Sequence, residues 1–391
     1  MSAKRILLVM HDFAGGGTER VAVRLANAWS RRGREVRIFC GTQAGPTRPL
    51  LSAQVEVQEA DPVLPRSLLS RAVLGRLLRD EAHRWQPDIV FGTGNFHLPV
   101  FAAYHAAGGS PARTVCKLSN PLRLDDPARL MAPAHSLGLR LLTRKIDALV
   151  AMSPALREEA QRILRRPGVL TAPEPILDGS SAQLPGNRAE AAGSPLVVCA
   201  GRLERQKNFH LALETFAALP PGLGARLAIL GEGSQRPSLE KLARRLGIAD
   251  RVEMPGHVSD VRHWLRQASA FLSTSRYEGY PAVLIEALAA RIPVITTDCS
   301  PAIREIVEHG TQGDVVPHAV EALSAALLRR LEAPATAGAP DTAADRLQRH
   351  RVEWAAGTYL RLLDDIAVTS TPAFADTPDP APFPCGHPAP A

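Results

Sequence analysis

The chain has 391 residues, of which 45% are apolar and 22% are charged, a composition ordinary for a globular protein and a length beyond what one hydrophobic core usually supports. The formal net charge of +7 is uneven, because residues 1–178 carry 25 basic and 16 acidic side chains (+9) and residues 179–391 carry 21 and 23 (−2). No run of eighteen apolar residues occurs, which excludes an ordinary transmembrane helix, and five scattered cysteines without a C-x-x-C pair argue for reduced thiols and against a zinc site.

In the first half, short apolar runs alternate with helical patterns. We expect a buried parallel strand at 6–9, because the apolar run there ends in a turn, and no signal peptide, because no small-residue cleavage site follows it. A helix is expected at 19–32, and further strands at 35–39, 89–91, 114–118 and 148–151. Residues 171–194 are rich in Pro, Gly, Ser and Ala and lack periodicity, which predicts a linker between two domains.

The same alternation restarts after the linker. Strands are expected at 196–200, 226–230, 252–254, 270–273 and 294–296, and helices at 209–219, 234–246, 259–267 and 281–290. Alternating strands and helices imply parallel sheets with right-handed crossovers, so the predicted class is α/β with two Rossmann-like halves. A last amphipathic helix is expected at 350–366, followed by a Pro-dense tail that we expect to be disordered.

Two Arg- and Leu-rich segments, 64–85 and 123–145, concentrate the positive charge. In the first, apolar side chains recur at helical spacing: Leu68, Leu69, Ala72, Val73, Leu77, Leu78 and Trp85. Arginines interrupt them at positions 66, 71, 76, 79 and 84. Two interpretations of these segments stay open. They could be ordinary amphipathic helices that cover a sheet, or they could form a face that docks on an anionic membrane. Nucleic-acid binding is not favoured, because no interleaved aromatic side chains or recognition motif accompany the charge.

Glycine-rich and basic loops follow several expected strands, at the edge where open α/β sheets bind ligands. Gly16 and Gly17 lie in a strand-to-helix turn whose backbone can approach a phosphate closely, and the absence of G-x-G-x-x-G disfavours a nicotinamide dinucleotide. Arg202 and Lys207 are five positions apart on one loop and can converge on one diphosphate. Gly231 belongs to a third turn of this kind.

The segment from Glu278 to Glu286 carries two carboxylates with seven residues between them. Pro281 suits the first position of a helix, whose free N–H groups favour an anion in front of it. The backbone groups concerned belong to Tyr280, Ala282 and Val283. With one carboxylate on each side of this anion site, the segment could accept hydrogen bonds from two sets of sugar hydroxyls.

This segment resembles the E-x7-E motif of family 4 retaining glycosyltransferases, which have the GT-B fold of two Rossmann-like domains. The flanking stretches 252–275 and 287–317 are similar to the second domain of that family, and the turn at Gly16 resembles its GG-x-E-R loop. The resemblance extends over roughly residues 4–365. It implies four parts, which are an acceptor-side domain at 1–178, a donor-binding domain at 179–349, a helix at 350–366 that returns to the first domain, and a tail at 367–391.

The resemblance also implies roles for individual residues. Arg202 and Lys207 would neutralise the diphosphate of a nucleotide-sugar donor, Glu286 would hold the ribose hydroxyls and Glu278 those of the donor sugar. The turn at Gly231, and Val258 next to His257, would lie near the ribose and the base. No Asp-x-Asp element occurs, so we expect no metal and no cofactor. The catalytic set is Arg202, Lys207 and Glu278, of which the two basic side chains would stabilise the departing diphosphate.

On the acceptor side the chain departs from the family pattern. Many family members have a histidine after the strand at 114–118, where this chain has Ser119 followed by Asn120. His97, after the strand at 89–91, could replace it by orienting an acceptor hydroxyl, and a capping or packing role for His97 stays open. Asn95 and Asn120 also follow expected strands and are candidate acceptor ligands.

The function implied by the resemblance is transfer of a sugar, with retention of configuration, from a nucleotide-diphosphate sugar to a glycan or lipid-linked acceptor. Such a reaction would serve surface polysaccharide or lipopolysaccharide biosynthesis, in the cytoplasm or at the inner face of the cell membrane. Two alternatives stay open, a GT-B nucleotide-sugar epimerase and a catalytically silent member that binds a nucleotide sugar.

Overall fold

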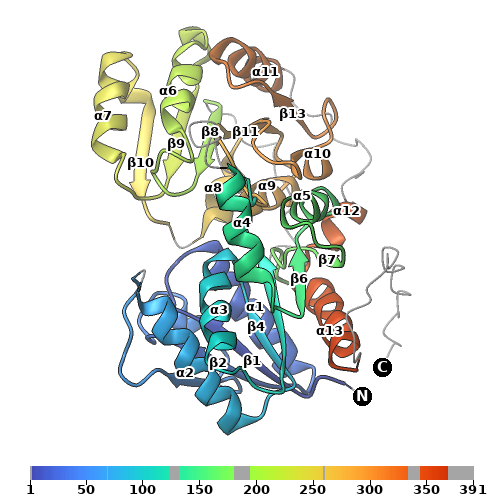
Figure 1. Cartoon of the computed structure of the whole chain (residues 1–391). Helices are drawn as coiled ribbons and strands as arrows, with labels where there is room; N and C mark the ends of the chain where they lie inside the picture. The colour runs from blue at the N-terminus through green and yellow to red at the C-terminus, as the bar shows by residue number, and fades with distance from the viewer. Residues whose placement is uncertain are drawn as a thin grey trace, which may run out of the picture.

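The computed structural model describes residues 2–67, 69–123, 132–179, 194–258, 260–332 and 344–368. Figure 1 shows two halves, one above the other, each built on a parallel sheet. The strand orders are β3-β2-β1-β4-β5-β6-β7 in the first half and β10-β9-β8-β11-β12-β13 in the second. Both orders reverse beside the first strand of the half, which is the topology of a Rossmann-like domain and confirms the predicted fold class.

In the first half, the strands are β1 (Arg5–Met10), β2 (Glu35–Cys40), β3 (Glu56–Glu59), β4 (Ile89–Gly92), β5 (Arg113–Leu118), β6 (Ala148–Ala151) and β7 (Val169–Thr171). The α-helices are α1 (Gly17–Arg31), α2 (Ser70–Trp85), α3 (Leu98–Ala106), α4 (Ala132–Thr143) and α5 (Pro154–Leu164). A short 3-10 helix, η2 (Asn95–His97), precedes α3.

In the second half, the strands are β8 (Leu196–Ala200), β9 (Arg226–Leu230), β10 (Val252–Gly256), β11 (Ala270–Ser273), β12 (Val294–Thr297) and β13 (Gly313–Val316). The helices are α6 (Phe209–Ala217), α7 (Arg236–Arg245), α8 (Val261–Gln267), α9 (Ala282–Ala289), α10 (Ile303–Ile306), α11 (Val320–Glu332), α12 (Ala344–Gln348) and α13 (Val352–Val368).

All the expected strands form, and several extend by one or two residues beyond the prediction. Strands β3, β7 and β13 were not expected, because each has only three or four residues and too short an alternation to stand out from a loop. Pro281 is the N-cap of α9, with extended backbone angles, and not its first helical residue. Leu68, residues 124–131, most of the linker (180–193) and the tail from residue 369 lie outside the described residues.

Helix α2 differs from the expectation in its start and in its buried face. It begins at Ser70, whose hydroxyl lies 3.0 Å from Nε2 of His11 and is drawn into the core. The buried stripe therefore runs through Ser70 and Leu74. Two residues expected on the apolar face, Leu69 and Val73, are instead 84% and 37% exposed.

Helix α13 packs against the first half, alongside α1 (Figure 1). The indole N–H of Trp29 on α1 donates a hydrogen bond to the carbonyl of Ala356 (3.1 Å). Trp29, Phe91 and Tyr359 form a buried aromatic group with ring centroids 5.3–6.3 Å apart. The chain thus passes from the first half to the second after β7 and comes back before α13.

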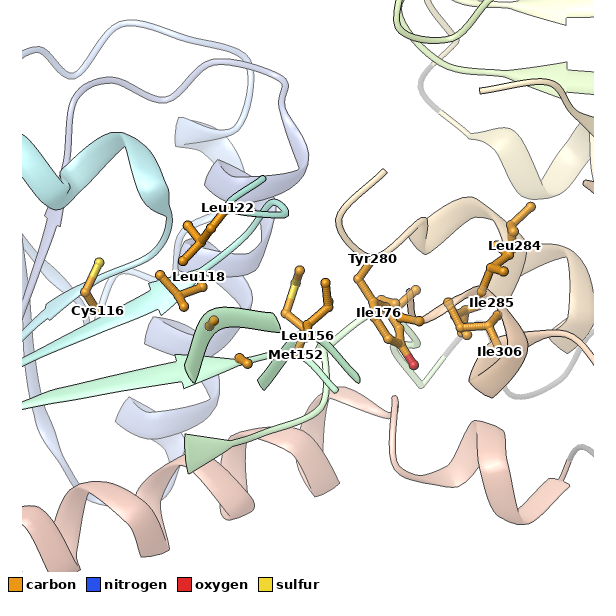
Figure 2. Packing of buried hydrophobic residues seen from close by; sticks show 14 of the residues in the cluster. Cys116, Leu118, Leu122, Met152, Leu156, Ile176, Tyr280, Leu284, Ile285 and Ile306 are labelled. Carbon is orange, nitrogen blue, oxygen red and sulfur yellow. The ribbon is translucent and has the colours of Figure 1, made fainter. Parts of the chain in front are cut away.

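The two crossing segments are bonded to each other. The N–H groups of Ile176 and Leu177 both donate to the carbonyl of His350 (2.9 Å each), and the N–H of Val352 donates to the carbonyl of Leu177 (2.8 Å). A continuous buried cluster surrounds this point. Figure 2 shows Leu118 and Leu122 of the first half on one side, Leu284, Ile285 and Ile306 of the second half on the other, and Leu156, Ile176 and Tyr280 between them.

An ion pair is buried beside the crossing. The amino group of Lys117 on β5 lies 2.7 Å and 3.0 Å from the two carboxylate oxygens of Glu174, and the Lys117 side chain is 0% exposed. Each charge needs the other, because an unpaired buried charge has lost its hydration without compensation.

We therefore predict that Lys117→Met lowers the free energy of unfolding by about 3–5 kcal/mol, since it leaves the Glu174 carboxylate buried and unpaired. Urea denaturation measures this loss. The double variant Lys117→Met, Glu174→Met removes both charges and should recover most of it. A loss under about 1 kcal/mol in the single variant would contradict the assignment.

Candidate active site

Two glycine-containing loops of the second half, both predicted to bind the donor, pack closely against each other. Gly201 follows β8 with φ +150, and Gly231 follows β9 with φ +144. A Cβ atom on Gly231 would overlap the carbonyl oxygen of Gly201, and one on Gly201 would lie 2.8 Å from Cε of Lys207. Both positions therefore require glycine, and the close approach holds the Lys207 side chain against the loop.

Lys207 and Glu278 form an ion pair with a distance of 2.6 Å between Nζ and Oε1. The hydroxyl of Ser275 donates to the same carboxylate oxygen (2.7 Å). The two charged side chains are only 18% and 10% exposed, so the pair is largely shielded from water. The structure thus brings together two of the three predicted catalytic residues, although 71 positions separate them.

The basic loop is tied to the segment that carries Glu278. Gln206 donates from its side-chain amide to the carbonyl of Tyr277 (3.0 Å), and its own carbonyl accepts from the N–H of Arg276 (2.8 Å). Arg202 is exposed, and its closest polar contact is Gln206 Oε1 at 3.4 Å. Its guanidinium is therefore available to a ligand at the same loop.

Glu286, the second carboxylate of the motif, lies on α9 and faces the first half. It makes no hydrogen bond or ion pair with the described part of the chain, so its oxygens can accept from a ligand. Burial raises the pKa of Glu286, and Arg24 and Arg20 on α1 act in the opposite direction. Arg24 itself is fixed by a hydrogen bond to the carbonyl of Pro175 (3.1 Å).

The predicted phosphate turn of the first half caps α1. Gly16 is the N-cap and Gly17 the first residue of this fifteen-residue helix. A Cβ on Gly17 would meet no atom within 4 Å, so this side of the turn is open. The N–H groups of a helix N-terminus favour an anion. Just beyond the turn, Glu19 and Asp12 both bind the guanidinium of Arg66.

The acceptor-side residues form a bracket that touches the donor segment. The side chain of Asn95 accepts from the N–H of Ser119 (2.8 Å) and donates to the carbonyl of Asn120 (3.0 Å), so it joins the loops after β4 and β5. A Cβ on Gly279 would overlap the carbonyl oxygen of Ser119. The carbonyl of Ser119 therefore lies against the backbone of Gly279, the residue next to Glu278.

His97 is placed below this surface. Its side chain is 3% exposed, and neither ring nitrogen makes a hydrogen bond within the described residues. Burial lowers its pKa to about 3, so the ring is neutral near pH 7. In this position, it packs against Phe96 with ring centroids 5.7 Å apart, and the guanidinium of Arg71 lies over the same Phe96 ring.

The remaining predicted residues lie around α9 and β10. Ala282 and Val283 form the first turn of α9, and Val258 is half-buried just after β10. Tyr280 is buried, and its hydroxyl lies 3.0 Å from Nε2 of His350. Because Nδ1 of His350 faces a carbonyl, which can only accept, Nδ1 carries the proton and Nε2 accepts from Tyr280.

Sequence reasoning missed several residues that shape this site. Ser275 and His350 are ordinary polar residues in the sequence, and only contacts across 3 and 70 positions give them a role. Arg66 and Arg71 were counted as charges on an amphipathic helix, whereas both guanidinium groups lie over the ring of Phe96. The Pro65 just before Arg66 was the one signal that the helix starts later than the apolar pattern suggests.

Comparison with known proteins identifies the class to which the chain belongs. Residues 15–170 match the family described as Glycosyltransferase Family 4, and residues 182–346 match the family described as Glycosyl transferases group 1. HepE of Anabaena, solved in complex with UDP and glucose, has a TM-score of 0.66 at 20% identity, over 94% of this chain and 96% of that chain. The chain is a GT-B glycosyltransferase.

Relatives of this glycosyltransferase include LpsE of Rhizobium meliloti, named a lipopolysaccharide core biosynthesis glycosyltransferase. It is 28% identical over 293 residues, which cover 73% of this chain and 77% of the relative. A glycosyltransferase of Rickettsia africae has a TM-score of 0.72 at 14% identity, over 95% of this chain and 100% of that chain. The fold of the whole chain is therefore shared with solved enzymes of this class.

The contact at Gly279 generates a prediction for the glycosyltransferase. In Gly279→Ala the new methyl group would overlap the Ser119 carbonyl, so the two halves must move apart. A displacement of about 1 Å can cost a hundredfold in rate, and we expect a fall in glycosyl transfer of about that size together with a larger radius of gyration in X-ray scattering.

Gly222→Ala is the matched control, because nothing lies within 4 Å of its Cβ position. It should leave both measurements unchanged. If Gly279→Ala kept full activity and the same scattering curve, the contact between the halves would not be needed for the reaction.

Proposed function

We propose that this glycosyltransferase moves a sugar from a nucleotide-diphosphate sugar to a glycan or lipid-linked acceptor, with retention of configuration. The ion pair of Lys207 and Glu278, set beside Arg202 and opposite the Ser119 bracket, carries the proposal. HepE binds UDP and glucose, which supports a UDP-sugar as the donor, and the name of LpsE supports a product in lipopolysaccharide or related surface polysaccharide.

The proposed reaction moves negative charge onto the departing diphosphate. The bond from the sugar C1 to the diphosphate oxygen breaks, a bond from C1 to the acceptor oxygen forms, and the hydroxyl proton passes to the departing phosphate. Negative charge grows on that phosphate, so fixed cations stabilise the transition state more than the ground state. Arg202, Lys207 and the N-terminal amides of α9 would supply this stabilisation, and the proposal needs no metal ion.

Each carboxylate of the motif has a separate part in this proposal. Glu286, whose oxygens are free, would accept hydrogen bonds from the ribose hydroxyls. Glu278 is already bonded to Lys207 and Ser275 through one oxygen, which leaves its other oxygen for a hydroxyl of the donor sugar. Gly16, Gly17, Gly231 and Val258 would complete the contacts to the phosphates and the nucleoside.

The test is product analysis with UDP-glucose and other nucleotide sugars in the presence of glycan and lipid-linked acceptors. We expect Arg202→Ala and Lys207→Ala each to lower kcat by about 10²–10³, because each removes a group that stabilises the leaving phosphate. Arg205→Ala, an exposed arginine on the same loop, is the control and should retain activity.

Three results would count against the proposal. Full activity in both Arg202→Ala and Lys207→Ala would remove the assigned roles. An epimerised nucleotide sugar formed without acceptor would favour the epimerase, and binding without any release of nucleoside diphosphate would favour a silent member.

We further propose that the first half rests on an anionic membrane surface through the helical layer formed by α2, α3 and α4. Exposed apolar side chains lie on this layer at Leu69, Val73, Leu137 and Leu141, with Arg76 exposed among them. The described helices contain none that is long and apolar enough to cross a bilayer. The charge of +9 on residues 1–178 supports attraction to anionic lipid.

The double variant Leu69→Glu, Arg76→Glu should weaken binding to vesicles of phosphatidylcholine and phosphatidylglycerol by at least tenfold. Each basic residue at such a surface contributes about 1 kcal/mol, and the charge reversal adds repulsion. Co-sedimentation measures the change, and Leu246→Glu on the second half is the control. Equal binding of the variant and the wild type would refute this docking face.

A further inference from the structure

We infer that the acceptor carries an anionic group, a phosphate or a carboxylate, and that Arg71 binds this group against the face of Phe96. The inference rests on the proposed function, because it names the chemistry of the acceptor for the same site. It assigns to Arg71 a role in selecting the acceptor that no motif in the chain indicates.

The first observation is the state of the Arg71 side chain. Its guanidinium carbon lies 3.9 Å from the centroid of the Phe96 ring, a stacking distance. Nε of Arg71 is buried without a hydrogen-bond partner, and the guanidinium forms no ion pair with any residue that the structure describes. An arginine that stacks on an aromatic ring and has no anionic partner can donate hydrogen bonds to a ligand from the N–H groups at the edge of its guanidinium.

The second observation is the contrast with Arg66, which lies over the same ring at 4.9 Å. Arg66 donates from Nε and Nη2 to the two oxygens of Asp12 (2.8 and 2.7 Å) and from Nη2 to Glu19 (2.6 Å). The two nearby carboxylates are thus already engaged by one arginine. Among the described residues, Arg71 has no anionic partner, and it lies next to a second cation.

The other ionisable groups that the structure describes around the Phe96 ring do not provide a negative charge to pair with Arg71. His11 and His97 each pack against Phe96 in a T-shaped arrangement, with 5.4 Å and 5.7 Å between ring centroids. Burial lowers the pKa of both imidazoles, so both are neutral near pH 7. Burial and the neighbouring Arg66 also lower the pKa of Arg71, and an anion placed on Arg71 would relieve that strain between like charges.

The loop that carries the ring connects the Arg71 site with the acceptor-side bracket. Phe96 directly follows Asn95, the side chain that joins Ser119 and Asn120. Ser119 in turn touches Gly279, the neighbour of Glu278. Towards the other side, Arg66 links Phe96 to Glu19, in the first turn after Gly16 and Gly17. A group bound at Arg71 therefore lies on the first half, the proposed acceptor side, and away from the Arg202 loop of the second half.

The experiment is calorimetric titration of the full chain at low salt with four small probes. Glucose 6-phosphate and glucuronate represent an anionic sugar, glycerol 3-phosphate represents a phospholipid headgroup, and glucose is the neutral reference. The variants are Arg71→Gln, Arg71→Lys and the control Arg162→Gln, which changes an exposed arginine on α5 of the same half, outside the layer of α2, α3 and α4.

We expect the wild type and Arg162→Gln to bind at least one anionic probe tenfold or more tightly than glucose. Arg71→Gln should lose this preference, and Arg71→Lys should retain part of it, because the charge remains without the planar fork. Tight binding of the sugar probes points to a charged glycan acceptor, whereas preference for glycerol 3-phosphate points to a lipid headgroup. Thermal unfolding of each variant is recorded in parallel.

Two outcomes would overturn the inference. One is equal binding of the anionic probes by the wild type and Arg71→Gln, and the other is no preference for any anionic probe over glucose in the wild type. UDP-glucose is titrated into the same samples as a separate measurement. If UDP-glucose and the other nucleotide sugars failed to bind the wild type, the proposed donor would be wrong, while the anion site at Arg71 would stand or fall on its own data.

Discussion

The buried contact between the two halves is the constraint on which the site depends. Neither half alone contains both the basic loop with its carboxylate and the acceptor-side bracket. A continuous apolar cluster, running from Leu118 through Leu156 and Ile176 to Ile285, fixes their separation (Figure 2). Because such interiors are close-packed, the cluster allows few intermediate arrangements, and the contact of Gly279 with Ser119 is held where the cluster sets it.

Within that frame, the charged groups divide into paired and unpaired sets. Lys207 is paired with Glu278, Lys117 with Glu174, and Arg66 with Asp12. Arg202 and Glu286, by contrast, keep their charge for a ligand. Arg202 and Glu286 both belong to the second half, where the proposed donor would meet them, and Arg71 belongs to the first half, where the proposed acceptor would meet it.

The sequence was sufficient to predict the parallel sheets, because buried strands and amphipathic helices leave clear periodic patterns, and the loops at Gly16, Arg202 and Glu278 follow strand ends as expected. It was not sufficient for the short edge strands or for the start of α2, where the Ser70 hydroxyl is buried 3.0 Å from Nε2 of His11. Contacts such as that of Tyr280 with His350, 70 positions apart, have no local signature at all. The charges that remain unpaired can be recognised only after all the partners are placed.

The return of α13 to the first half has a consequence for synthesis on the ribosome. Tyr359 and its neighbours complete an aromatic core whose other members, Trp29 and Phe91, are translated long before them. The N-terminal sheet therefore stays incompletely covered until the whole donor-binding half has emerged from the ribosome. During translation, the second half behaves as an inserted domain, and a nascent chain that stalled before residue 352 would expose the apolar surface that α13 normally covers.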